Sequence, residues 1–271
     1  MRLFTVGLRK LVRRPATYVT FGLLVGLLTL IYLAVGGTAR QASTSANGAA
    51  ETLLLLTFPG AYTLLLSFTL GLGGLFAMIY GAAIAGSEWT WGTLKAAVAR
   101  GESRSRYQLL SFASIGVMLG IGLLVAFAIG IIVVIVAAGI AGVSTVGLGD
   151  AATLRTLPEL LGRGWLALAE AGALGFAIAT VARSQLAGIG VGIAFYFGEQ
   201  FASIFLPDIV KYLPFNAAAA VVATTTRVGG NGGGGPVARL DPDTALLVVA
   251  AWLIGALIVT ALFTERAEIS G

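Results

Sequence analysis

Six stretches of this sequence are long and apolar enough to cross the hydrocarbon core of a bilayer as helices, each needing about 20 residues. Four of the six contain no charged side chain. The predicted spans are 18–36, 61–85, 110–138, 165–182, 186–206 and 245–263. In lipid a backbone must satisfy its own hydrogen bonds, and the sequence lacks the alternation of barrel strands. We therefore predict an all-α polytopic membrane protein, with residues 1–271 forming a single transmembrane domain.

The residue types present narrow the chemistry that this chain can perform. Only 11% of the 271 residues are charged, against roughly 25% in soluble domains. The sequence has no Cys and no His, which excludes disulfides, thiolate nucleophiles and the commonest metal ligands and general base. No segment fits the GxxxxGK[ST] pattern of a phosphate-binding loop. We therefore expect no enzyme activity, no cofactor and no metal on this chain.

Basic residues are distributed unequally between the two sides of the six predicted spans. With the N-terminus inside, 11 of the 17 Lys and Arg residues fall in cytoplasmic segments. The outer loops hold six basic residues, balanced by six acidic ones. This asymmetry predicts that both termini are cytoplasmic. The excess positive charge is then expected to face an anionic lipid surface in the bilayer, and no nucleic-acid partner is expected.

Residues 2–14 form a separate amphipathic segment before the first span. Its apolar face consists of Phe4, Leu8, Leu11 and Val12. Pro15 is expected to break the helix there, because proline cannot continue the backbone hydrogen bonding. The pattern favours an interfacial helix lying along the inner leaflet, and a disordered basic leader is the alternative.

The loop between the second and third spans is longer than a simple connection requires. A short helix is predicted within residues 87–100, with one face made of Trp91, Leu94, Ala97 and Val98 and with Lys95 beside it. Gly101 is expected to end this helix, and Ser103 to cap the next one. The alternative is a solvated charged turn in an unrelated carrier.

This loop resembles that of the permease subunits of type-2 ATP-binding-cassette (ABC) exporters. The matching residues are the acidic Glu88, the core Gly92–Thr93–Leu94 and the pair Ser103–Arg104. Two positions depart from the family pattern: Gly101–Glu102 stands where the family often has Pro, and Gln108 where it often has Lys. The resemblance implies that residues 87–100 are a coupling helix that docks on an ATPase subunit. The implied coupling residues are Glu88, Trp91, Gly92, Thr93, Leu94, Lys95, Val98, Ser103 and Arg104.

The resemblance also implies an assembly and a location. Two ATPase subunits, which bind ATP and Mg²⁺, are expected to assemble with two permease chains. The two permease chains would form a homodimer or a heterodimer, and the assembly would lie in a prokaryotic plasma (inner) membrane. Residues 207–244, which include FLPDIVKYLPF in part, are expected to form an outer loop or helical hairpin. Transport would proceed by alternating exposure or by lateral extraction, and drugs, peptide antibiotics, lipid-linked molecules and ions all remain compatible substrates.

Two carboxylates, Glu170 and Glu199, fall inside the fourth and fifth spans, where an acidic side chain is costly. The run Gly198–Glu199–Gln200 predicts local unwinding of the fifth span. Glu170, Glu199 and Gln200 are candidates for a substrate path. Three interpretations stay open: binding of a cationic substrate, proton relay in a secondary carrier, or structural polar contacts. The predicted function is the permease subunit of an ATP-driven ABC exporter, and the alternative is a proton-coupled secondary carrier using Glu170 or Glu199.

Overall fold

The computed structural model describes residues 2–42, 53–222 and 240–266, and in these ranges the chain forms helices and no strand. Six of the helices are long and apolar enough to span a membrane. They are α2 (Pro15–Ala42), α4 (Gly60–Thr90), α6 (Arg104–Ala141), α7 (Ala151–Ala182), α8 (Gln185–Phe205) and α11 (Pro242–Arg266). The predicted all-α, six-helix membrane fold is confirmed.

The spanning helices differ from the predicted spans mainly in length. Helix α7 begins 14 residues before the predicted start at Trp165. Asp150 caps it by accepting the backbone N–H of Thr153 at 2.9 Å, as a carboxylate at a helix N-terminus should. The predicted span did not include this first part of α7, because residues 151–164 contain the charged Arg155, Glu159 and Arg163 and are less apolar. A helix that extends beyond the apolar layer needs no apolar side chains there.

The shorter elements lie between and before the spans. They are α1 (Arg2–Val12), α5 (Thr93–Val98), α9 (Pro207–Val210), α10 (Pro214–Val221) and a 3₁₀ turn (Val146–Gly149). Part of the predicted outer segment 207–244, residues 223–239 with their glycine-rich run, lies outside the described residues. Its described beginning forms α9 and α10, two short helices with a turn between them.

Helix α1 packs against α6 rather than extending away from the bundle. The Ser114 hydroxyl of α6 donates to the Phe4 carbonyl at 3.3 Å, and Leu11 is buried. Val12, which was predicted to share the apolar face, is exposed instead. Pro15 begins α2, a position that tolerates proline because its missing N–H has no partner in the first turn of a helix.

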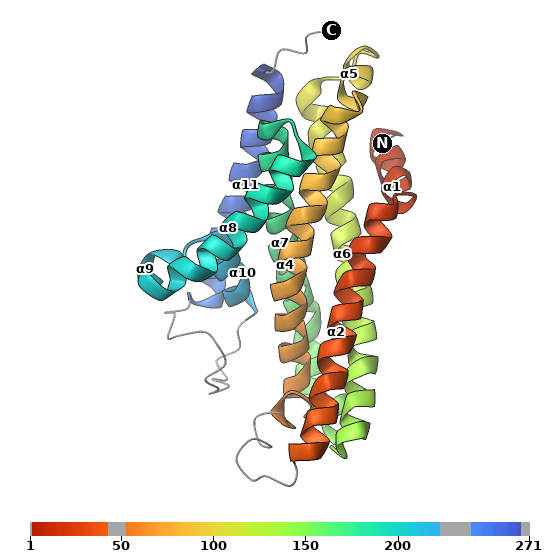
Figure 1. Cartoon of the computed structure of the whole chain (residues 1–271), viewed down its shortest axis with the longest axis vertical. Coiled ribbons are helices and arrows are strands. Elements are labelled where there is room, and N and C mark those ends of the chain that lie inside the picture. Colours follow the sequence, from red (N-terminus) through yellow and green to blue (C-terminus); the bar gives the residue numbers. More distant parts are fainter. Residues whose placement is uncertain (1, 43–52, 223–239, 267–271) are drawn as a thin grey trace.

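Close contact between α4 and α7 forms the centre of the bundle (Figure 1). A Cβ added to Gly81 would lie 2.1 Å from the Gly172 carbonyl oxygen, and one added to Gly175 would lie 2.0 Å from that of Met78. Small residues allow helix backbones to approach this closely. Helix α8 departs from the bundle toward α9, and together with α11 it is the least buried of the spanning helices.

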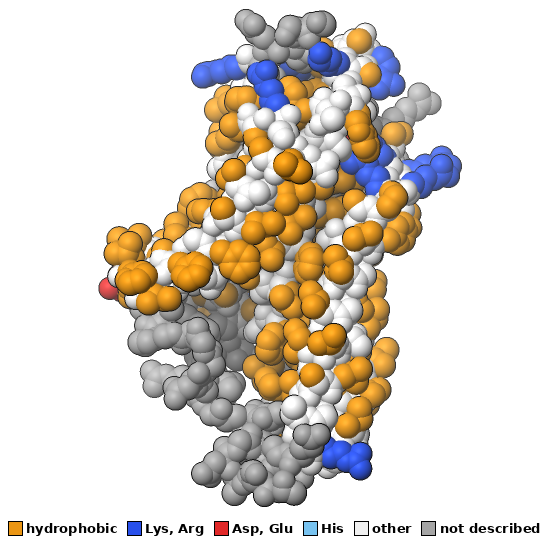
Figure 2. All heavy atoms as spheres, in the orientation of Figure 1, with side chains coloured by type: hydrophobic (Ala, Val, Ile, Leu, Met, Phe, Trp, Pro, Cys, Tyr) orange, Lys and Arg blue, Asp and Glu red, His pale blue; other side chains and the backbone are white. Residues whose placement is uncertain are grey.

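The two ends of the bundle carry different charge. Figure 2 shows Lys and Arg side chains gathered around the end that holds α5, where α1 and the end of α11 also lie. By helix direction, eleven basic and three acidic described residues belong to this end, and four basic and five acidic ones to the opposite side. The sequence asymmetry is therefore also an asymmetry of the folded molecule.

Candidate functional site

Glu88 lies in the last turn of α4, and only 1% of it is exposed. Its Oε1 lies 2.5 Å from Nζ of Lys10 in α1 and 3.9 Å from Nη2 of Arg14, between α1 and α2. A buried carboxylate requires a positive partner or several donors to offset its lost hydration. Glu88 has its positive partners on a segment more than 70 residues away in sequence.

The other carboxylate oxygen of Glu88 receives hydroxyl hydrogen bonds from two further elements. The Thr93 hydroxyl at the start of α5 donates to Oε2 at 2.8 Å, and the Tyr107 hydroxyl of α6 donates to the same atom. One side chain on α4 therefore connects α1, α5 and α6. We call Lys10, Arg14, Ser87, Glu88, Thr93 and Tyr107 the Glu88 cluster.

Arg14 extends this cluster to the surface. Its Nη1 donates to the Ser87 hydroxyl at 2.8 Å, and its guanidinium carbon lies 5.0 Å from the centroid of the Trp91 ring. That geometry is a cation–π contact. Trp91 itself is 66% exposed, which is unusual for so large an apolar side chain outside the spanning part of a helix.

The short helix α5 is held between two glycines in the left-handed region, Gly92 with φ 65° and Gly101 with φ 87°. Such φ values favour glycine because a Cβ would clash there. Residues 87–90 belong to α4, so the segment predicted as one helix at 87–100 is in fact a helix end followed by α5.

The face predicted for α5 is divided in the structure. Leu94 and Ala97 point into the molecule and are each 1% exposed, and Val98 is half-buried. Trp91 lies outside α5 and is exposed, as are Lys95 and Ala96. A partner at this surface would meet these exposed residues, because Leu94 is covered by its own chain.

The pair Ser103–Arg104 begins α6. Ser103 occupies the N-cap position as predicted, but its side chain makes no capping hydrogen bond. Arg104 instead donates from Nη1 to the carbonyl oxygen of Glu265, near the end of α11, at 3.4 Å. An arginine near a helix C-terminus stabilises the unpaired carbonyls there.

Glu199 in α8 has a defined structural partner. Its carboxylate accepts the backbone N–H groups of Phe215 (3.2 Å) and Asn216 (2.5 Å) and the Asn216 side-chain amide (2.8 Å). Those two N–H groups are among the unpaired donors at the start of α10. The predicted unwinding at residues 198–200 is wrong, since α8 is continuous and the groups that need Glu199 belong to α10.

Glu170 differs from Glu199 because no described residue pairs with it. It is 0% exposed within α7, and neither carboxylate oxygen has a hydrogen-bond partner among the described residues. A buried carboxyl group without a partner is unfavourable when ionised.

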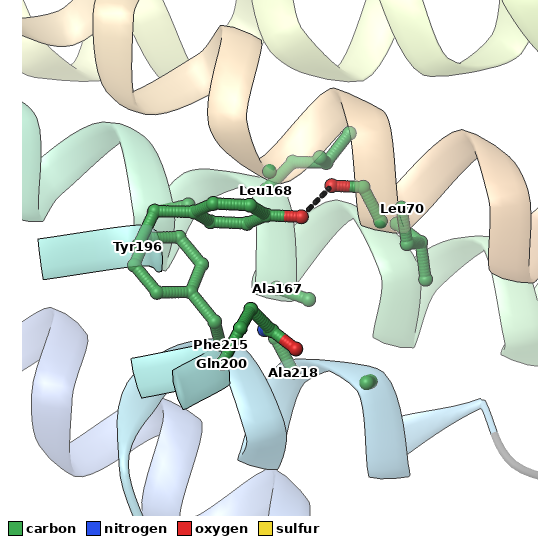
Figure 3. Close-up of a pocket in the computed structure, with 11 residues that line it drawn as sticks. Leu70, Ala167, Leu168, Tyr196, Gln200, Phe215 and Ala218 are labelled. Atoms are coloured by element: carbon green, nitrogen blue, oxygen red, sulfur yellow. Dashed lines mark hydrogen bonds between the residues drawn. The ribbon is translucent and has the colours of Figure 1, made fainter. Parts of the chain in front are cut away.

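A pocket of about 190 Å³ lies between α4, α7, α8 and α10 (Figure 3). Its wall is mostly apolar and includes Leu70, Leu168 and Phe215. Two polar side chains reach it: Gln200, and Tyr196, whose hydroxyl donates to the Gly71 carbonyl at 3.1 Å. Of the three candidate path residues, Gln200 lines this pocket, whereas Glu170 and Glu199 do not.

Sequence reasoning missed several residues that complete these sites: Lys10, Arg14, Tyr107, Tyr196 and Asn216. One signal was available for the first two, which stand four residues apart in the predicted amphipathic segment 2–14, although Arg14 lies beyond the end of α1. Their partner could not be identified, because opposite charges that are far apart in sequence do not show which pair will meet.

In comparisons with protein-family models and with curated proteins, nothing matches this chain. The fold therefore defines the class, an all-α multi-pass membrane protein.

Proposed function

We propose that this chain is the membrane-spanning permease subunit of an ATP-driven exporter of the type-2 ABC kind, forming the translocation path and working with a separate ATPase subunit. The observation that carries the proposal is α5, a short helix outside the spanning helices that the Glu88 cluster fastens to α1, α4 and α6. The resemblance of Glu88, Gly92–Thr93–Leu94 and Ser103–Arg104 to the family's loop supports the same assignment.

The way α5 is anchored suits a part that receives force. Leu94 and Ala97 are buried against the chain, and Thr93 hydrogen-bonds to Glu88. Packed interiors resist compression and transmit displacement. A push on the exposed side of α5 would therefore move α4 and α6 rather than be absorbed in a loose loop. The partner ATPase would supply ATP and Mg²⁺ binding, and two permease chains with two ATPase subunits would complete the assembly.

The charge distribution supports an orientation. An end with eleven basic and three acidic described residues is expected on the cytoplasmic side by the positive-inside rule. In the proposed orientation, α5 faces the side where ATP is available, and both termini are cytoplasmic. The proposed location is the inner membrane of a prokaryote.

Cross-linking from a single cysteine tests the proposal, since the natural chain has no Cys. Ala96→Cys lies on the exposed side of α5, and the matched control Val146→Cys is exposed between α6 and α7 on the opposite side. In native membranes a thiol-to-amine cross-linker should join residue 96, but not residue 146, to a nucleotide-binding ATPase. The purified chain alone should hydrolyse no ATP. Equal cross-linking from both positions, or none to an ATPase, would contradict the proposal.

A second candidate function, a proton-coupled secondary carrier, is favoured by the unpartnered carboxyl group of Glu170. Glu199 is a weaker candidate for the proton site because its oxygens are occupied by α10. In liposomes without any ATPase, a carrier would move substrate in response to an imposed pH gradient. Glu170→Gln should abolish that transport, whereas an exporter of the ABC kind should show none in either form.

A further inference from the structure

A second pocket, of about 290 Å³, lies near the end of the bundle that holds α5, where the C-terminal end of α7 meets the last turns of α11. Five residues line it: Arg183, Val259, Leu262, Phe263 and Arg266. Two arginines and three apolar side chains thus share one small surface. It is separate from the Glu88 cluster and has no part in the function proposed above.

Arg183 is held in place before any ligand arrives. It follows α7 in the left-handed conformation, with φ 51°. Its guanidinium carbon lies 5.4 Å from the ring centroid of Trp89 and 5.4 Å from that of Phe263. Cation–π contacts of this kind fix the plane of the guanidinium without using its N–H donors. Those donors remain suited to the oxygen atoms of a phosphate.

Arg266 supplies the second positive charge. It stands in the last turn of α11, is exposed, and makes no ion pair with any described residue. The adjacent Glu265 does not line the pocket, and its carbonyl oxygen receives Arg104. Two guanidinium groups therefore face one pocket with no described carboxylate in its lining.

The apolar part of the pocket extends from the arginines along α11. Val259, Leu262, Phe263 and Arg266 are spaced so that they share one helix face. Val259 and Leu262 are exposed large apolar side chains. The face therefore changes from charged to apolar in the direction that runs from the helix end into the membrane-spanning part.

We propose that this pocket binds an anionic glycerophospholipid of the surrounding leaflet. Its phosphate would contact Arg183 and Arg266, and the beginning of an acyl chain would lie on Val259, Leu262 and Phe263. Basic pockets between transmembrane helices are suited to lipid headgroups of this kind. A soluble phosphate compound would use the two arginines but would gain nothing from the apolar wall. A bound lipid would also join the turn between α7 and α8 to the end of α11.

The test measures lipid binding to the purified full-length chain in detergent by native mass spectrometry, with phosphatidylglycerol and the zwitterionic phosphatidylcholine as probes. The wild type should prefer phosphatidylglycerol. Arg266→Gln should weaken its binding about fivefold, and the Arg183→Gln/Arg266→Gln double variant about 25-fold. Arg106→Gln is the matched control, since this arginine is exposed at the same end but outside the pocket, and its binding should equal that of the wild type.

Three results would overturn the proposal. One is an unchanged preference for phosphatidylglycerol in Arg266→Gln, a variant at an exposed helix end that should fold normally. Another is an equal loss of binding in Arg106→Gln, which would indicate diffuse surface charge. The last is displacement of phosphatidylglycerol by an equal concentration of sn-glycerol 3-phosphate, which would make the pocket a site for a soluble phosphate. If Arg183→Gln lowers the folded yield, Arg183→Lys replaces it and should retain part of the affinity.

Discussion

Replacing Glu88 by alanine removes the carboxylate that connects α1, α4, α5 and α6, and the expected cost follows from its contacts. The hydroxyl groups of Thr93 and Tyr107 each donate to it. A hydrogen bond to a charged group is worth about 1.5–3 kcal/mol. Lys10 has 32% of its side chain exposed, so water screens its ion pair with Glu88, which contributes about 0–1 kcal/mol.

These contributions are not additive, because they share one side chain. We expect Glu88→Ala to lower the free energy of unfolding by about 3–5 kcal/mol. Glu88→Gln should cost about 1–2 kcal/mol, since its amide oxygen still accepts one hydroxyl hydrogen bond. Glu102→Gln is the matched control in the same loop, and its effect should stay within about 0.5 kcal/mol.

The assay is unfolding of the purified chain in mixed micelles by added sodium dodecyl sulfate, followed by circular dichroism. Limited trypsin digestion provides a local readout, because release of α1 from α6 should expose the bond after Arg13. Glu88→Ala should be cleaved there faster than the wild type. An alanine variant that unfolds within about 1 kcal/mol of the wild type, with unchanged cleavage, would show that the carboxylate does not hold these helices together.

Three further predictions concern other parts of the chain. Glu199→Leu should lower the melting temperature and the free energy of unfolding, the latter by about 2–4 kcal/mol, because the Asn216 backbone N–H and side-chain amide lose their acceptor. Glu199→Gln should be tolerated, and equal melting temperatures for the two variants would contradict this. Leu94→Asp should reduce the folded yield in size-exclusion chromatography, because it places a charge at a buried position; a normal yield would mean that α5 can detach. Gly81→Ala should destabilise the bundle by about 1–3 kcal/mol in the same unfolding assay, whereas Gly71→Ala, where a Cβ meets nothing within 4 Å, should not.

Prediction of the helices succeeded where a single physical property controls them. A membrane core of fixed thickness selects long apolar segments, so all six spanning helices were found. The boundaries were less accurate where a helix continues past its most apolar stretch, as in residues 151–164 of α7, which include three charged side chains. There, capping by Asp150 rather than hydropathy determines where the helix starts.

Prediction of the sites was less complete. Glu88 was singled out by the family resemblance and Glu199 as an acid within a span, but periodicity could not supply their partners. Glu88 meets Lys10, and Glu199 meets Asn216, through the packing of separate helices. The face predicted for α5 is partly buried and partly exposed because of the same packing of separate helices. A helical pattern in the sequence does not show that Leu94 will be covered by its own chain.

The sequence by itself determined that this chain crosses a membrane as six helices, because the free energy of placing side chains in lipid depends on residue type and segment length alone. It also determined the charge asymmetry between the two ends. Only the tertiary structure decided which charges are neutralised: Glu88 is paired, Glu199 caps α10, and Glu170 has no described partner. The physical reason is that Coulomb and hydrogen-bond energies depend on distances between side chains, and those distances exist only after the helices have packed.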